Sequence, residues 1–295
     1  MGGVRVTVLL FAVCGLFPSL LTAGTVAVTV SVAPQAHMVK AIGGDRVSVD
    51  AMVRSGQSAH TFSPSPRQMM ALSDARIYVK VGHPEYVFER RYLERLAELD
   101  HEVRVVNMAH GTDLRTLEEH AHGDGRGRHQ HEGGETDPHL WVSPRIMRAT
   151  ADRIAEALIA EDPAGEADYR AGLSRFHRQL DELDSELRET LDGLQRRMFL
   201  VNHPAWGYFA DEYGLQQRAI ESEGKDASPA QLAALIERTR ADDVKAIFVQ
   251  TGFSKRGALL IARELDMSVI SLDPMAEDWP GTLRSFARAL REFNG

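Results

Sequence analysis

Residues 163–195 read PAGEADYRAGLSRFHRQLDELDSELRETLDGLQ, one long amphipathic stretch in a chain of 295 residues. Asp162-Pro163 is a strong helix start. Apolar side chains then recur every three or four positions, the spacing of one helix face: Tyr169, Leu173, Phe176, Leu180, Leu183, Leu187, Leu191 and Leu194. At 1.5 Å per residue this helix would be about 50 Å long, more than a crossover between two neighbouring strands needs. We interpret it as a rigid strut between two lobes.

Strand and helix patterns alternate on both sides of this stretch. Short β-branched or apolar runs favour strands, and amphipathic segments between them favour helices. The expected strands are 26–32, 47–53, 77–81 and 103–106 before the strut, and 198–201, 217–220, 246–249 and 269–272 after it. Such alternation is typical of parallel sheets with helices on both faces. The predicted fold is α/β, with two small doubly wound lobes, 24–162 and 196–295, joined by one long helix, 163–195.

The N-terminus has the pattern of a secretory signal peptide over residues 1–23. Arg5 is followed by an apolar run from Val8 to Leu21 and a small residue at Ala23. The run is too short for a comfortable membrane span. The residues before Cys14 fit a lipid-anchor signal poorly, so we expect no lipidation there. These features predict an exported protein that is soluble in the periplasm, and we expect it to be a monomer.

Composition narrows the possible ligands and partners. Cys14 is the one cysteine, and signal-peptide removal would leave neither disulfides nor thiolate ligands. A formal net charge of −8 argues against nucleic acid as a partner, because phosphate binding needs clustered Lys and Arg. Any bound metal must therefore be held by His, Asp, Glu or the backbone.

Four residues stand where a parallel fold would bring them together. His60, His203 and Asp273 each follow an expected strand, and His139 precedes a helix that Ser143-Pro144 starts. In open α/β sheets, ligands bind outside the carboxyl ends of the strands. Three imidazoles and one carboxylate suit zinc, which favours four ligands in a tetrahedron. Each residue alone is more often structural, so the prediction rests on the coincidence of all four.

The pattern of alternation stops between residues 110 and 136. This segment has no apolar face and is rich in glycine, carboxylates and histidine, namely His110, His120, His122, His129 and His131. His-rich tracts indicate metal binding by composition only. The hypothesis is a secondary, weaker zinc collector, and the alternative is a solvated insertion without a role.

Four short motifs are similar to those of the zinc- and manganese-binding solute-binding proteins of ABC importers. They are residues 56–66 (GQSAHTFSPSP), 137–141 (DPHLW), 202–209 (NHPAWGYF) and Asp273-Pro274. The resemblance covers 26–293 and implies two α/β lobes with metal in the cleft between them. Manganese members typically carry a carboxylate where this chain has His203, so the resemblance implies zinc, as does the preference of zinc for imidazole. Gln250 departs from the Glu frequent in the family, and Ala59 and Thr61 replace residues more usual there.

We therefore expect high-affinity periplasmic capture of Zn²⁺ and its delivery to an ABC permease in the inner membrane. One alternative is a secreted zinc hydrolase, with Glu221 or Glu223 as a base, although the chain has no His-Glu-x-x-His pair. Another is a periplasmic zinc buffer or chaperone without a permease. We expect no enzymatic activity, because all four candidate residues fit as ligands and leave no open position for a reacting water.

Overall fold

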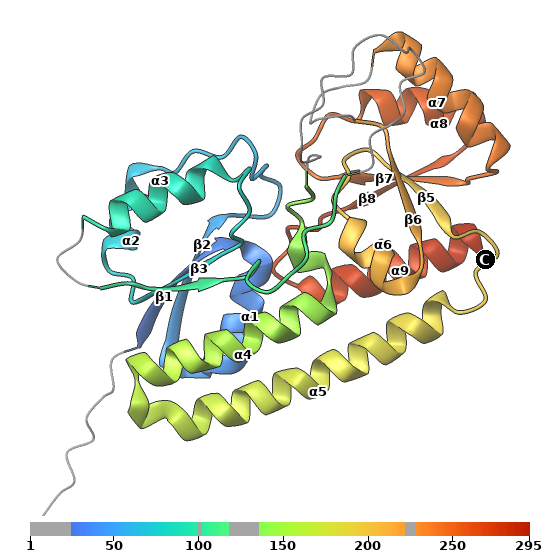
Figure 1. The fold of residues 1–295 in the computed structure, drawn as a ribbon. Helices are drawn as coiled ribbons and strands as arrows, with labels where there is room; N and C mark the ends of the chain where they lie inside the picture. Colours follow the sequence, from blue (N-terminus) through green and yellow to red (C-terminus); the bar gives the residue numbers. More distant parts are fainter. Residues whose placement is uncertain (1–24, 99–101, 118–135, 222–227) are drawn as a thin grey trace, which may run out of the picture.

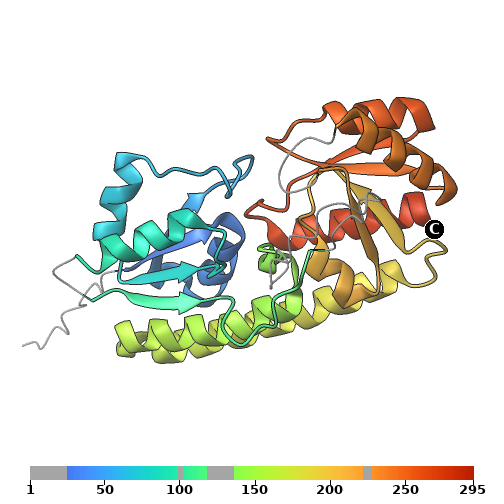
Figure 2. The same cartoon turned by 45° about the horizontal axis from the view of Figure 1, so that its top comes forward.

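The computed structural model describes residues 25–98, 102–117, 136–221 and 228–295. Two α/β lobes lie side by side, and one long helix runs beneath both of them (Figures 1 and 2). The predicted fold class is confirmed. The lobes share a plan, because each has a four-stranded parallel sheet with helices on both faces.

The N-terminal lobe is built on a sheet of order β2-β1-β3-β4. Its strands are β1 (Val26–Val32), β2 (Val47–Val53), β3 (Ile77–Lys80) and β4 (Arg104–Asn107). Its helices are α1 (Ala33–Gly43), α2 (Pro66–Ser73), α3 (Val87–Leu96) and α4 (Pro144–Glu161). The central strands β1 and β3 are almost wholly buried, as expected for a parallel sheet that is covered on both faces.

The C-terminal lobe repeats this arrangement with the sheet order β6-β5-β7-β8. Its strands are β5 (Met198–Val201), β6 (Gln216–Ala219), β7 (Ala246–Gln250) and β8 (Ser268–Leu272). Its helices are α6 (Gly207–Tyr213), α7 (Pro229–Ala241), α8 (Arg256–Leu265) and α9 (Trp279–Asn294). In each lobe the first strand is an interior strand, with the second strand on one side of it and the third on the other. The direction of strand addition therefore reverses beside the first strand, and ligands of such sheets usually bind at this point.

The linking helix is shorter than predicted. Pro163–Gly165 form a 3-10 turn, and α5 runs from Glu166 to Leu191, about 39 Å at 1.5 Å per residue. It ends early because Gly193 takes a left-handed φ of 67°, which a continuing α-helix excludes. The apolar stripe nevertheless holds, and α5 packs against α1 and α4 of one lobe and α9 of the other.

One glycine of α5 permits the close approach of α1. A Cβ at Gly172 would lie 2.1 Å from the carbonyl oxygen of Ile42, near the end of α1. Only glycine fits at this crossing without moving one of the helices. The contact fixes the N-terminal lobe on the strut.

The larger of two hydrophobic clusters among the described residues runs from one lobe through α5 into the other, and the smaller one lies within the C-terminal lobe. The larger cluster includes Val30 of β1, Phe176 of α5 and Phe286 of α9. Two indoles also link the lobes: Trp141 Nε1 donates to the carbonyl of Pro274 (2.8 Å), and Trp279 Nε1 donates to the carbonyl of Trp141 (2.6 Å). Since close-packed interiors resist deformation, these contacts oppose wide opening of the lobes.

The described ends of the His-rich segment pair with each other. Thr116 and Thr136 form an antiparallel bridge, and Asp137 N–H donates to the carbonyl of Arg115 (2.7 Å). The segment therefore leaves and rejoins the lobe at adjacent points. Among the described residues no helix is both long and apolar enough to cross a membrane; the predicted signal peptide lies outside them.

Candidate metal centre

Three of the four predicted ligands meet between the lobes. His60 comes from the loop between β2 and α2, His139 stands just before the 3-10 turn Leu140–Val142, and His203 lies two residues after β5. One ligand nitrogen from each ring lies within 4.8 Å of those of the other two. The ring centroids are 5.0–5.6 Å apart, and the three planes are inclined to each other by 61–80°. Three imidazoles so placed can bind one cation.

Two of these rings have a carboxylate behind them. His139 Nδ1 lies 2.8 Å from Asp137 Oδ1, and His203 Nδ1 lies 3.2 Å from Glu221 Oε2. Both carboxylates are buried. A carboxylate accepts but cannot donate, so each Nδ1 carries the proton and each Nε2 presents its lone pair.

The two Nε2 atoms then face each other at 3.1 Å. Two lone pairs at this distance repel one another, whereas a cation between them would be bound by both. Carboxylate–histidine–metal chains of this kind orient the ring and raise its basicity toward the metal. The donor set suits a divalent metal that accepts imidazole.

Burial keeps two of the imidazoles neutral. Loss of hydration, aided by the neighbouring rings of His139 and His203, lowers the pKa of His60 to about 3. Loss of hydration also lowers the pKa of His203, against the opposing effect of its hydrogen bond to Glu221. Both rings therefore keep a free lone pair at neutral pH, as a metal ligand requires.

Asp273 lies outside this group of three. Its Oδ2 accepts hydrogen bonds from the Ser55 hydroxyl and from Gly56 N–H (3.1 Å), and its Oδ1 accepts from Met275 N–H (2.9 Å). Within the described residues, the set of side chains close enough to share an ion contains the three histidines and not this carboxylate. Asp273 therefore ties the loop that carries His60 to the C-terminal lobe.

Aromatic side chains form the walls of the centre. Phe253 stacks on His203, with centroids 4.6 Å apart and planes inclined by 28°. Tyr86 meets the edge of His60 at 5.6 Å, and Trp141 meets His139 at 5.4 Å. These ring contacts cover part of each imidazole and restrict its orientation.

Sequence reasoning missed the two supporting carboxylates as such. Asp137 belongs to a motif that was singled out, but its role depends on a short turn that points its carboxylate back to His139. Glu221 was considered only as a base. The strand order could have predicted its role. β5 and β6 are parallel neighbours, so His203 and Glu221, which follow them, lie at the same edge of the sheet.

Three other described histidines, His37, His83 and His177, have contacts that explain their positions without a metal. His83 is buried, and its Nε2 lies 2.7 Å from Thr136 Oγ1. His37 packs against Phe176, and His177 lies 3.2 Å from Asp152. These contacts give each ring a partner away from the three-histidine group.

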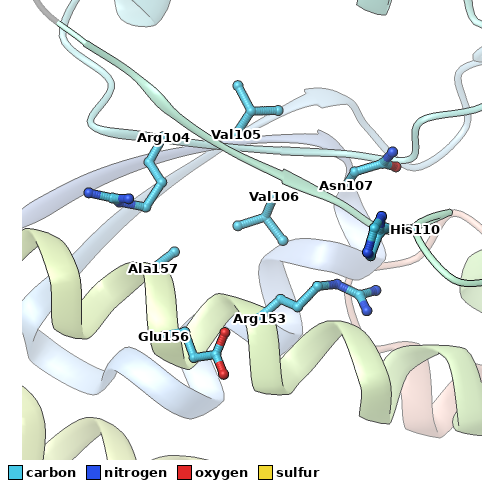
Figure 3. A pocket seen from close by; sticks show the side chains of 8 residues that line it. All are labelled: Arg104, Val105, Val106, Asn107, His110, Arg153, Glu156 and Ala157. Carbon is cyan, nitrogen blue, oxygen red and sulfur yellow. The ribbon is translucent and has the colours of Figure 1, made fainter.

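Of the five histidines in the His-rich segment, the structure describes His110. It lines a hollow of about 380 Å³ between β4 and α4, beside Asn107, Arg153 and Glu156 (Figure 3). The hollow contains none of His60, His139 and His203. The remaining four lie outside the described residues: His120, His122, His129 and His131.

Known proteins are similar to this chain in sequence and in fold. A family profile described as "Zinc-uptake complex component A periplasmic" matches residues 28–293. A "Putative metal-binding protein" of Chlamydia trachomatis is 26% identical over 263 residues, 89% of each chain. The "High-affinity zinc uptake system protein ZnuA" of Bacillus subtilis is 28% identical over 241 residues, 79% of this chain and 73% of that protein.

Solved structures with similar folds point to the same family. A crystal structure of ZnuA superposes with a TM-score of 0.82 at 34% identity, covering 92% of this chain and all of the other. A zinc-bound ZnuA with an internal deletion gives 0.81 at 34% identity, covering 92% of this chain and 98% of the other. The family is a solute-binding component of transport rather than an enzyme, which removes the hydrolase alternative. The family profile spans nearly all of the described residues, and the chain therefore belongs to the periplasmic component A family of zinc-uptake complexes.

Proposed function

We propose that this protein captures Zn²⁺ with His60, His139 and His203 and passes it to an ABC permease. The convergence of three imidazoles, two of them backed by buried carboxylates, is the observation that carries the proposal. Imidazole suits zinc, while manganese prefers oxygen ligands. Relatives named for zinc uptake and a zinc-bound neighbour support the choice.

For the fourth ligand we propose Asp273. Its carboxylate would exchange the hydrogen bonds from Ser55 and Gly56 for the metal, and the loop that carries His60 would shift with it. A carboxylate also offsets part of the cation's charge, which neutral imidazoles cannot do. Asp273→Asn keeps most of the local hydrogen bonding but weakens the ligand, so a loss of zinc affinity in this variant supports the assignment.

The direct test of capture is native mass spectrometry of protein purified without added metal. One zinc ion per chain is the expected result. A competition titration with a zinc chelator then gives the affinity, with His139→Ala as the damaged variant and His177→Ala as its control. An unchanged affinity in His139→Ala would overturn the site.

Delivery to a permease is the second part of the proposal. It rests on the family's role as one component of an uptake complex. Export to the periplasm after removal of residues 1–23 fits that role, and N-terminal sequencing of the secreted protein checks it. Zinc-dependent growth of a deletion strain, restored by this chain only when permease and ATPase are present, separates delivery from simple buffering.

The His-rich segment is proposed to hold additional, weaker zinc. Ordering each backbone residue of a long segment costs about 1–2 kcal/mol, which opposes tight binding there. Deleting residues 118–134 should leave one tight zinc per chain and remove the weaker ions, as seen by calorimetry. If both the full chain and the deletion variant bind one zinc ion, the segment does not bind additional zinc.

A further inference from the structure

The three ligand histidines are backed by carboxylates to very different degrees. The Nδ1 atoms of His139 and His203 lie 2.8 and 3.2 Å from the buried Asp137 and Glu221. His60 Nδ1 has Glu85 Oε2 at 4.0 Å, and the two side chains are 31% and 30% exposed. The third pair thus also joins an imidazole to a carboxylate, but its N–O distance is longer and its side chains are more exposed to solvent.

The backbone of Glu85 is held firmly. Its N–H donates to His83 Nδ1 (3.3 Å), and its carbonyl accepts from Val87 N–H (2.9 Å). Because His83 Nδ1 accepts this bond, the neutral ring carries its proton on Nε2 and donates it to Thr136 Oγ1 (2.7 Å).

Thr136 directly precedes Asp137, the carboxylate behind His139. The buried His83 therefore joins the turn that carries Glu85 to the segment that supports another ligand. This gives His83 a role in the site without making it a ligand.

A gap of 4.0 Å is too long for a direct hydrogen bond, but one bridging water or a small rotation would close it. His60 needs an acceptor for its Nδ1 proton when its Nε2 binds a metal. Among the charged pairs that the structure records, Glu85 supplies that acceptor.

We propose that Glu85 is a positioning residue for His60, and that this loosest pair sets the rate at which zinc leaves the site. The inference rests on the proposed function, since it concerns the same three-histidine centre. Supporting carboxylates typically change metal affinity about 10–100-fold. Because solvent screens an exposed pair, about threefold to tenfold is expected here.

The experiment measures zinc dissociation by stopped-flow mixing of the zinc-loaded full chain with excess chelator. Glu85→Ala should raise the dissociation rate about threefold to tenfold and leave the association rate nearly unchanged. Glu85→Gln, whose amide oxygen still accepts, should recover most of the wild-type rate. Glu94→Ala, which removes an equally charged, exposed side chain from α3, is the matched control and should behave as wild type.

A double-mutant cycle decides whether Glu85 acts through His60. The effect of Glu85→Ala on equilibrium zinc affinity should vanish when His60 is already alanine. An effect that persists in the His60→Ala background, or one equal to that of Glu94→Ala, would overturn the positioning role.

Wild-type protein without a tight zinc site would instead overturn the proposed function, and this inference with it. Melting curves of the metal-free variants show whether a change in rate is only a loss of folding. An altered rate with wild-type melting supports the proposal.

Discussion

His203 and His60 are two of the three imidazoles at the metal centre, with ring centroids 5.5 Å apart, and they are held in different ways. His203 is buried, stacked on Phe253 and hydrogen-bonded to Glu221, which Asn202 also fixes through a 2.6 Å bond. His60 stands on a loop, is partly exposed, and has its nearest paired carboxylate 4.0 Å away. His203 is thus preorganised to bind, which reduces the ordering cost of capture, whereas His60 is held by fewer contacts.

The largest expected effect comes from removing a ligand on the fixed side. His203→Ala or His139→Ala should weaken zinc binding by well over tenfold, which is more than about 1.4 kcal/mol, since each also takes the imidazole away from a buried carboxylate. His60→Ala should cost about tenfold, but less than the other two. Competition titration measures all three.

His37→Ala and His177→Ala are the controls for that series, because their rings pack away from the centre. Affinity losses as large in the controls as in the ligand variants would remove the three-histidine site. A loss of zinc affinity in His60→Ala larger than that in His203→Ala would reverse the comparison of the two histidines.

The next effect comes from disturbing a support without touching a ligand. A Cβ at Gly207 would lie 2.3 Å from Asp137 Oδ2, so Gly207→Ala should push this carboxylate and turn His139. Zinc affinity should fall about tenfold, the lower end for supporting carboxylates. The same titration checks it.

Gly172→Ala is a matched control for Gly207→Ala. It crowds α5 against α1 far from the histidines, and overpacking of this kind costs about 1–3 kcal/mol of stability. Its melting temperature should fall while its zinc affinity stays close to wild type. If both variants lose affinity equally, the effect of Gly207→Ala is a general loss of packing.

The metal-free protein should lose stability in acid. The pKa of His60, lowered to about 3 by burial, lies below its unfolded value of about 6.5. Between these values the unfolded chain binds the extra proton, so the free energy of unfolding falls as pH drops from about 6.5 toward about 3.

Because His60 is partly exposed, its share of the slope should be well below the limit of about 1.4 kcal/mol per pH unit. His60→Gln should flatten the pH dependence of the urea midpoint over this range. Identical pH profiles for wild type and His60→Gln would contradict the lowered pKa.

The smallest effect concerns the lobes themselves. One core runs through both lobes and α5, and the bonds of Trp141 and Trp279 link them directly. Zinc loss should therefore change the loop that carries His60 more than the angle between the lobes. Small-angle scattering of zinc-loaded and metal-free protein should agree closely, and a large change in the radius of gyration would refute a rigid strut.

Much of the fold could be predicted because the hydrophobic pattern of the sequence is periodic in its strands and helices. Alternating strands and helices predicted two parallel sheets, and parallel strands place their carboxyl ends on one edge, so His60 and His203 were expected to meet. Three features depend on finer geometry. Asp273 precedes a proline, and the turn it forms uses its carboxylate for backbone N–H groups, so its place among the ligands remains a prediction. The end of α5 depends on the φ of Gly193, and the roles of Glu221 and Glu85 depend on strand order and side-chain direction.

The central claim is that three imidazoles hold the transported ion. X-ray absorption spectroscopy of the protein loaded with one equivalent of zinc tests it most directly, because imidazole rings give a distinctive outer-shell scattering pattern. The account predicts four light-atom ligands, three of them imidazole nitrogens at about 2.0–2.1 Å. A first shell of oxygen with one imidazole or none would contradict it.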